Sequence, residues 1–382
     1  MSHFDSRRQF LAAALATAAA AAARQPASGA SGDASAPIPM IHATDLYRPY
    51  NDPDDHWDLA CVYALAQRGA FDLKAVLIDY PPPKRAWDPD VMAVAQMNYL
   101  TGSAVPVLVG SPRASIADGA EAWRPEFAGI RAVLEILRGS PAPVVINIAG
   151  STRDVALASK LDRRLFANKC AAVYLNAGSG TPDRAKAAQL EYNVGLDPAN
   201  YAAIFQLPCP VYWMPCFEDF TREACVREWG TYYRFRHDAV LPALSPRLQN
   251  YFLLMYRHGD AANGSAPPAG SQWDWLRSLD GPPDAATLAK QSPVWRNMWC
   301  TGGFLHAAGL SVSRTGEIVP RSAGADPVFT FDPIRVACSS EGITEWKSDP
   351  GATNRFIFHV HDVEHYEQAM TTTLRTLLTA LR

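Results

Sequence analysis

Short apolar runs recur along the first two-thirds of the chain, and segments with helical spacing separate them. The runs lie at residues 38–45, 73–79, 105–110, 142–150, 170–178 and 209–216. Most are rich in Val, Ile, Leu and Ala, which is typical of strands buried on both faces of a parallel sheet. Between the first two runs, residues 55–68 place Leu59, Val62 and Ala66 at three- and four-residue spacing, as on one face of a helix. The pattern predicts an α/β fold whose mostly parallel central sheet has helices on both faces.

The last third of the chain is less regular. Residues 217–325 are rich in Trp, Tyr, Arg, Pro and Gly, with one helical pattern near 246–257. We interpret this region as a cap of helices and long loops within a single α/β domain that spans 37–382. Two strand-like runs and a final helix capped by Asp362 then complete the chain.

The first 36 residues have the composition of a targeting segment. Arg7 and Arg8 precede an uncharged, Ala-rich run from Phe10 to Ala23, and small residues continue to Ala36. This order predicts an export signal of the twin-arginine type with a linker, and hence a periplasmic or extracellular protein. An Ala-rich leader without a targeting role is the alternative. The apolar run is shorter than the roughly 20 residues that a spanning helix needs, so no membrane span is expected.

Charge and cysteine usage argue against several classes of protein. The net charge is -3 and there is no Lys/Arg cluster outside the N-terminus, which argues against a nucleic-acid partner. Seven cysteines without a C-x-x-C pair argue against zinc-ribbon and thioredoxin-like sites. Cys61 and Cys170 are expected in the core, and one disulfide among Cys209, Cys216 and Cys225 is compatible with export.

An acidic stretch coincides with the end of the first strand and the start of the next helix. Residues 45–58 contain five aspartates: Asp45, Asp52, Asp54, Asp55 and Asp58. One or two acids at this place are common as helix caps and partners of the helix dipole. A larger group repels itself unless a cation lies within it. Because calcium binds six to eight oxygen ligands, the stretch predicts a divalent cation site at the carboxyl end of the sheet.

The same stretch resembles the signature of the inosine–uridine-type nucleoside hydrolases. In that family an Asp-x-Asp follows the first strand and an Asp-Asp pair opens the next helix. Here Asp45 matches the second Asp, Ala43 replaces the first, and Asp54 and Asp55 follow after a longer gap. The resemblance implies a nucleoside-hydrolase-like fold with Ca2+ as cofactor. It implies that Asp45 is a metal ligand and the general base, that Asp55 is the main metal ligand, and that Asp54 binds a ribose hydroxyl.

Two further segments carry the resemblance. The stretch "LEYNVGLDPANYAAIF" at 190–205 resembles the family's Glu-Phe-Asn block, which implies that Glu191 and Asn193 bind the sugar, together with Asn176 at the end of the fifth run. The stretch "IAGSTRDVALA" at 148–158 resembles a turn in which a backbone carbonyl binds calcium. By position that carbonyl belongs to Arg153.

Other parts of the chain depart from the family pattern. The expected His-Asp-Pro is missing; His306 is the best positional candidate for assisting the leaving base, and Asp332 and the His237–Asp238 pair are alternatives. Tyr80 and three prolines stand where the family has a ribose-binding Asn. Aromatic residues such as Trp87 could stack on a base or sugar. A late group of histidines, His359, His361 and His365, is interpreted as lying across the last strand and the final helix rather than as a metal site.

These observations predict a calcium-dependent hydrolase acting on the N-glycosidic bond of a ribonucleoside or a related N-ribosyl compound. The partner would be a nucleoside-like small molecule, and association into a homo-oligomer is left open. One alternative is the same fold acting on another sugar-containing substrate, and another is a non-catalytic sugar- or nucleoside-binding protein. A phosphotransfer enzyme is disfavoured by Ala43, and a dinucleotide oxidoreductase by the lack of G-x-G-x-x-G after any strand.

Overall fold

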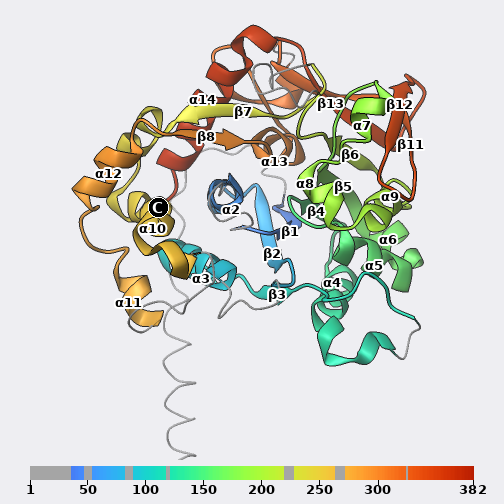
Figure 1. The fold of residues 1–382 in the computed structure, drawn as a ribbon, viewed down its shortest axis with the longest axis horizontal. Helices are drawn as coiled ribbons and strands as arrows, with labels where there is room; N and C mark the ends of the chain where they lie inside the picture. Colours follow the sequence, from blue (N-terminus) through green and yellow to red (C-terminus); the bar gives the residue numbers. More distant parts are fainter. Residues whose placement is uncertain are drawn as a thin grey trace, which may run out of the picture. The chain divides into compact units, whose positions relative to one another are not determined.

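The central element of the computed structural model is a nine-stranded sheet with the order β12-β11-β13-β6-β5-β4-β1-β2-β3 (Figure 1). Its strands are β1 (Ile38–Thr44), β2 (Phe71–Ile78), β3 (Val107–Val109), β4 (Val144–Ile148), β5 (Cys170–Asn176), β6 (Val211–Met214), β11 (Phe329–Cys338), β12 (Thr344–Ser348) and β13 (Arg355–Val360). Strands β13 through β3 pair in parallel, and β11 is antiparallel to both β13 and β12. The predicted mostly parallel α/β fold is confirmed.

The structure describes residues 36–46, 54–81, 89–117, 121–218, 228–262, 272–323 and 326–382. The predicted export signal, Asp52, Trp87 and Cys225 lie outside these ranges. Residues 37–382 form one compact unit. Within the described residues, no helix combines the length and apolar character required to cross a membrane.

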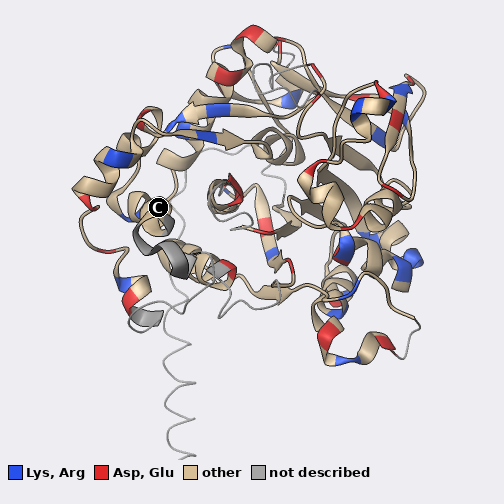
Figure 2. Ribbon diagram, viewed as in Figure 1, with Lys and Arg blue, Asp and Glu red and all other residues tan. Residues whose placement is uncertain are grey.

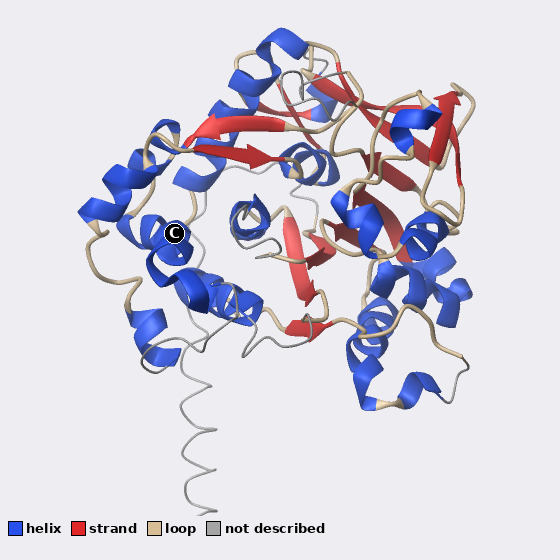
Figure 3. Cartoon of the chain, viewed as in Figure 1, coloured by secondary structure: helices blue, strands red, loops and turns tan. Residues whose placement is uncertain are grey.

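Helices surround the sheet in the way that alternating strands and helices require (Figure 3). They are α2 (Asp54–Gln67), α3 (Pro89–Thr101), α4 (Ala128–Gly139), α5 (Arg153–Leu161), α6 (Arg163–Lys169), α7 (Arg184–Ala187), α8 (Tyr192–Leu196), α9 (Pro198–Ile204), α10 (Pro246–Ala262), α11 (Gln272–Arg277), α12 (Ala285–Gln291), α13 (Thr301–Ala307) and α14 (Val363–Thr379). The predicted cap of α14 is confirmed, because the Asp362 carboxylate accepts a hydrogen bond from the backbone N–H of His365.

Two hydrophobic cores lie on opposite faces of the sheet. Successive residues of a strand point to opposite faces, so Met40 packs in the core with α2, α3, α13 and α14, whereas Ile41 packs in the core with α4, α5, α6 and α9. Cys61 and Cys170 are buried, as predicted. Cys209 and Cys216 are free thiols, so the structure does not join these two in the predicted disulfide.

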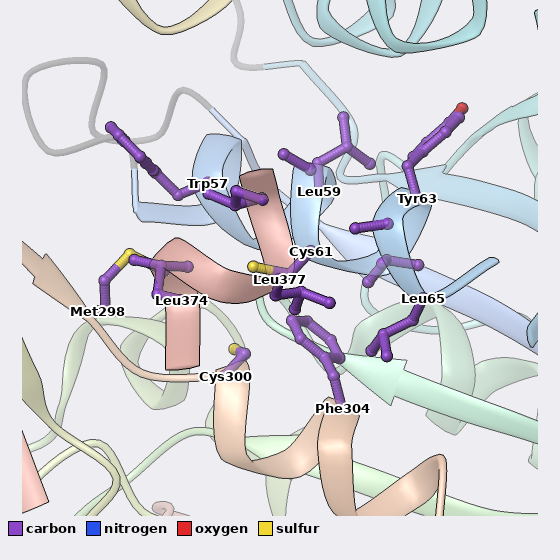
Figure 4. Packing of buried hydrophobic residues seen from close by; sticks show 14 of the residues in the cluster. Trp57, Leu59, Cys61, Tyr63, Leu65, Met298, Cys300, Phe304, Leu374 and Leu377 are labelled. Carbon is purple, nitrogen blue, oxygen red and sulfur yellow. The ribbon is translucent and has the colours of Figure 1, made fainter. Parts of the chain in front are cut away.

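Helix α2 is buried around most of its circumference. Figure 4 shows its side chains packed against residues of α13 and α14, with Cys61 and Phe304 among the contacts. Eleven consecutive residues, Asp55 through Leu65, are buried. A helix enclosed in this way fixes the position of its first turn, where the acidic residues lie.

The region 217–325 contains strands that the sequence did not predict. The described part forms helices α10 to α13, as expected of a cap. It also contains two antiparallel pairs, β7 (Tyr233–Arg236) with β8 (Trp295–Met298) and β9 (Leu310–Val312) with β10 (Ile318–Pro320). These strands have three or four residues each, too few for a periodic pattern to appear in the sequence.

Candidate active site at the carboxyl edge of the sheet

The sheet order reverses between β1 and β4. From β1 the chain adds β2 and β3 on one side and β4, β5 and β6 on the other. In sheets of this type, ligands bind beyond the carboxyl ends of the strands at the point of reversal. Asp45 directly follows β1, Asp79 follows β2, and Gly150 and Ser151 follow β4. These four residues therefore meet at the place where this topology forms a binding site.

Hydrogen bonds connect the acidic residues to the strand ends. The Thr44 hydroxyl donates to Asp55 Oδ2 at 2.6 Å, and the Asp45 backbone N–H lies 3.4 Å from the same oxygen. The Ser151 backbone N–H donates to Asp79 Oδ2 at 2.8 Å. Because Thr44 is the register partner of Ile78, the residues that follow them, Asp45 and Asp79, lie side by side. The first turn of α2 and three strand ends thus converge on one cluster.

Gly150 allows this convergence because it has no side chain. A Cβ atom at this position would lie 2.9 Å from the Asp45 backbone nitrogen and 3.0 Å from Asp79 Oδ2. Both distances are shorter than ordinary van der Waals contact. The turn after β4 therefore needs a glycine to approach the ends of β1 and β2 this closely.

A pocket of about 110 Å³ opens beside the cluster. Its lining residues are Asp45, Asp79, Tyr80, Ser111, Ser151, Arg153, Asp154, Tyr192 and Leu196. Tyr80 and Tyr192 are 45% and 51% exposed, whereas Asp45 is only 5% exposed. The pocket is therefore acidic at its base and aromatic at its more exposed part. In Figure 2 the acidic positions at the start of α2 lie inside the surrounding elements.

Burial and mutual repulsion favour the protonated forms of these carboxyl groups. Burial, and then the charges of Asp55 and Asp79, raise the pKa of Asp45 well above its ordinary value. Burial also raises the pKa of Asp55 to about 6, although hydrogen bonds from Thr44 and Asp45 oppose the shift. The pKa of Asp154 rises to about 7, because of burial and the charge of Asp79. The cluster therefore carries an electrostatic strain that a cation would relieve.

One carboxylate oxygen of the acidic cluster lacks a hydrogen-bond partner. Asp45 Oδ2 is buried and has no hydrogen-bond partner among the described residues. Buried polar atoms are normally paired, and a carboxylate oxygen left unpaired is costly. Carboxylate oxygens from Asp45, Asp55 and Asp79 are the hard donors that calcium prefers. The residues at this site therefore fit a divalent cation of that class.

A second acidic residue of α2 faces α13. Asp58 is fully buried, and the ligand atoms of Asp55, Asp58 and Cys300 all lie within 4.8 Å of one another. Burial, and then the charge of Asp55, raise the pKa of Asp58 well above its ordinary value. Cys300 stands immediately before α13, so this helix brings a thiol to the inner side of the cluster.

Three of the four residues predicted to bind a sugar form a connected network beside the pocket. The Glu191 carboxylate accepts hydrogen bonds from the backbone N–H groups of Gly178, Asn193 and Val194. Asn193 Nδ2 contacts the backbone oxygens of Ala149 and Asn176 at 3.3 Å. The Asn176 side chain donates to Met214 O and to the Thr231 hydroxyl. Their side chains therefore hold the ends of β4, β5 and β6 together, and a sugar-binding role stays a prediction.

Arg153 lines the pocket with its side chain. Its guanidinium forms an ion pair with Asp197 at 3.0 Å, and its backbone N–H lies 3.3 Å from the Ser151 hydroxyl. As the first residue of α5, it has a carbonyl directed along the helix toward the following turn. The structure thus places a cationic side chain at the pocket, and a role for the Arg153 carbonyl as a calcium ligand stays a prediction.

His306 lies in a different pocket. The Tyr174 hydroxyl is 2.8 Å from His306 Nδ1, and Arg321 Nη1 is 2.5 Å from Nε2. Burial, and then the charge of Arg321, lower the pKa of His306 to about 3. The pocket that His306 lines shares no residue with the acidic pocket. The structure does not bring His306 to the predicted site.

The alternative candidates also lie elsewhere. His237 is buried and stacks on Trp57 with ring centroids 5.6 Å apart. Asp332 pairs with His359 on β11 and β13.

The sequence predicted roles for Asp45, Asp54 and Asp55, and it did not single out Asp79, Asp154 or Cys300. Asp79 could have been found, because it follows the second strand just as Asp45 follows the first. Asp154 lies in the first turn of α5, where an acid is an ordinary dipole partner. Cys300 is far from α2 in sequence, and only the packing of α13 against α2 brings it near.

Comparison with solved structures places this fold among known ones. The chain is similar to a plant nucleoside hydrolase, with a TM-score of 0.52, 12% identity, and coverage of 90% of this chain and 99% of that one. It also matches an inosine–guanosine nucleoside hydrolase, with a TM-score of 0.46, 13% identity and coverage of 88% and 98%. A third match is the type III effector protein XopQ complexed with adenosine diphosphate ribose, with a TM-score of 0.47, 16% identity and coverage of 90% and 95%. No family model matches the sequence, and no curated protein does. The fold is therefore nucleoside-hydrolase-like.

Proposed function

We propose that this protein is a metal-dependent hydrolase that cleaves the N-glycosidic bond of a ribonucleoside or a related N-ribosyl compound. The observation that carries the proposal is the buried, unpartnered oxygen of Asp45 beside Asp55 and Asp79, at the point where the sheet order reverses. The resemblance of the acidic stretch to nucleoside hydrolases and the shared fold support the same conclusion.

The metal is proposed to be Ca2+, held by Asp45 and Asp55 with Asp79 beside them. A bound calcium ion supplies positive charge that lowers the pKa of a water ligand and can hold vicinal sugar hydroxyls. The raised pKa values of Asp45 and Asp55 describe the cluster without such a charge. Because a cation binds the ionised carboxylates, these groups are expected to bind it more tightly as the pH rises through their raised pKa values.

Asp45 is the proposed general base. Hydrolysis requires a water molecule to lose a proton as it attacks the anomeric carbon, while the bond between that carbon and the base nitrogen breaks. Asp45 can accept the proton only when it is ionised, and the neighbouring carboxylates oppose this form unless positive charge offsets them. Asp54, in the same first turn of α2, is proposed to bind a sugar hydroxyl.

The two exposed tyrosines suit the remaining part of such a substrate. Asp45, Asp79 and Asp154 line the inner part of the pocket, where a sugar could lie against the acidic cluster. Tyr80 and Tyr192 line the same pocket with exposed rings, on which a planar base can stack. These features support a binding mode in which the sugar lies at the acidic base of the pocket and the leaving group lies against the tyrosine rings.

A release assay tests the proposal. The chain is incubated with Ca2+ and a panel of purine and pyrimidine nucleosides, and free base and reducing sugar are measured. Asp45→Asn is expected to reduce release by about 100-fold to 10,000-fold, the usual range for a lost general base. Asp72→Asn is the matched control, because Asp72 lies on β2 far from Asp79 and pairs with Lys74 at the surface. Release that survives in Asp45→Asn would contradict the assignment.

A second candidate function follows from the sugar-side residues. Glu191, Asn193 and Asn176 already hold backbone groups, and Tyr80 replaces the Asn that the resemblance leads us to expect. These features favour another sugar-containing substrate on the same fold. Calcium binding without release from any nucleoside would support this candidate, and a panel of other N-glycosides would then identify the substrate. Calcium binding without turnover of any of them would indicate a sugar-binding protein.

A further inference from the structure

A group of polar side chains lies on one face of the β11–β13 pair, away from the acidic pocket. Thr330 on β11 is the register partner of His359 on β13, and Asp332 lies two residues further along β11. Side chains two residues apart in a strand point to the same face. Asp332, His359 and His361, which follows the end of β13, therefore project on the same side.

These residues are in direct contact. His359 Nδ1 is 2.6 Å from Asp332 Oδ2. The Thr330 hydroxyl is 2.7 Å from Asp332 Oδ1 and 2.7 Å from His361 Nε2. The ligand atoms of Asp332, His359 and His361 all lie within 4.8 Å of one another. Tetrahedral sites with metal–ligand bonds of about 2.0–2.2 Å need ligand atoms about 3.4 Å apart, so small side-chain movements suffice.

The surrounding structure holds the two imidazoles in place. The Trp229 ring stacks on His359 with centroids 4.1 Å apart, and the rings of His359 and His361 are 4.2 Å apart. Backbone hydrogen bonds from Val360 N to Glu228 O at 2.8 Å and from His361 N to Val328 O at 2.9 Å fix the end of β13. Two of the three candidate ligands therefore lie on, or directly beyond, a strand that is paired on both sides.

Acidic side chains surround the cluster. Burial, and then the charge of His359, lower the pKa of His361, whereas the charges of Asp332, Asp326 and Glu228 oppose that shift. His359 lowers this pKa because two protonated imidazoles at this distance repel each other. A single metal ion bound by both rings satisfies the acidic neighbours without placing a proton on each ring.

We propose that Asp332, His359 and His361 form a binding site for a divalent transition-metal ion, with zinc as the representative. Two imidazoles and one carboxylate are a donor set that zinc accepts, with a water molecule completing the coordination. Calcium prefers an all-oxygen set, so this site and the acidic pocket select different ions. The histidine trio expected from the sequence is divided: His365 contacts Asp362 at the start of α14 instead.

The site is separate from the proposed active site. Strands β6, β5 and β4 lie between β13 and β1. Four inter-strand steps of about 4.8 Å place the two strands about 19 Å apart. None of the three ligands lines the acidic pocket. The zinc site therefore does not depend on the proposed hydrolase function.

Calorimetric titration of the full chain with ZnCl2 tests this proposal. The chain carries no histidine tag and is first treated with a chelator. Because Asp55, Asp58 and Cys300 could also take zinc, the titration is performed in a Cys300→Ser background. One zinc ion is expected to bind. His359→Gln and His361→Gln are each expected to weaken binding by more than the ~10–100-fold typical of losing an outer partner of a metal ligand.

His365→Gln is the matched control, because it removes an exposed histidine of the same segment that is outside the cluster. This variant is expected to bind zinc with unchanged affinity. Saturating Ca2+ is also expected to leave the zinc affinity of the parent protein unchanged. Circular dichroism confirms that each variant is folded. The proposal is overturned if the folded Cys300→Ser protein binds no zinc, if His359→Gln and His361→Gln bind it as tightly as their parent, or if His365→Gln weakens binding equally. Loss of nucleoside release in Asp45→Asn, with zinc binding intact, would show that the two sites are independent.

Discussion

At the residue scale, the acidic pocket depends on carboxyl groups that cannot all ionise without a counter-charge. Asp45, Asp55 and Asp79 come from three separate elements, and Thr44 and Ser151 orient two of them by hydrogen bonds. These hydrogen bonds restrict the rotation of the Asp55 and Asp79 carboxylates. The proposed cation would therefore meet ligands that are already in position, which reduces the entropy lost on binding.

Removal of the Asp55 charge is expected to remove most of the calcium affinity. Asp55→Asn keeps the size of the side chain and an oxygen that can accept from Thr44. It loses one of the few negative charges available to the ion, so Kd is expected to rise by at least about 100-fold. Calorimetric titration with Ca2+ measures the change, and circular dichroism checks that the fold is retained. Equal affinity in the variant and the parent would show that calcium does not bind at Asp55.

Only part of the acidic cluster could be predicted from the sequence. Asp45, Asp54 and Asp55 form a local pattern that is readable without a structure. Asp79 and Cys300 reach the cluster through strand register and helix packing, which no local pattern records. His306 was selected by its position along the chain, which does not determine the pocket that a side chain lines, and the structure places it in a different pocket from Asp45.

At the element scale, the turn between β4 and α5 determines how closely the strand ends approach. Gly150 in this turn lies against the backbone of Asp45. Backbone atoms, unlike the end of a side chain, cannot rotate away from an added methyl group. The parallel strands β1 to β6 were predictable because most of them are rich in apolar residues, whereas β12, with the sequence Thr-Glu-Trp-Lys-Ser, was not predicted. The small β7–β8 pair was not, because its partners are about 60 residues apart and each has only four residues.

Gly150→Ala is expected to destabilise the protein and weaken calcium binding. The added methyl group would meet the Asp45 backbone at 2.9 Å, and relief requires β1 and β4 to separate. Overpacking of this kind costs about 1–3 kcal/mol. Gly139→Ala, at the end of α4, is the matched control because its added methyl group meets nothing within 4 Å. Chemical denaturation measures both variants, and an equal small effect in the two would show that the turn has room for a side chain.

At the scale of the whole molecule, the raised pKa values link stability to pH. The pKa values of Asp55 and Asp154 are about 6 and about 7 in the folded protein, against 3.8 for an ordinary aspartate. The folded state therefore holds these protons more tightly than the unfolded state does. The resulting stabilisation is complete below the ordinary value and is lost as the pH rises through about 6 to 7.

Thermal melts with a chelator are therefore expected to show a Tm that falls between about pH 6.5 and pH 8. Below that range the buried His42, His237 and His306, whose pKa values are lowered to about 3, 4 and 3, add stability as the pH rises and oppose the fall. Added Ca2+ should raise Tm more at pH 8 than at pH 5, because ligands bound only to the folded state stabilise it. Asp154→Asn should flatten the decline, since it removes one of the titrating groups. A chelated protein whose Tm is constant across this range would contradict the raised pKa values.

The direction of β1 has a practical consequence for studying the protein on a surface. Residue 37 enters the sheet at its amino edge, and Asp45 leaves it at the carboxyl edge after a strand of seven residues. At about 3.3 Å per residue, the two ends of this strand are about 23 Å apart. A fusion partner or immobilising tag joined just before residue 37 would be attached at the edge of the sheet opposite the acidic pocket. Single-molecule or sensor measurements anchored there would leave the acidic pocket on the side away from the surface.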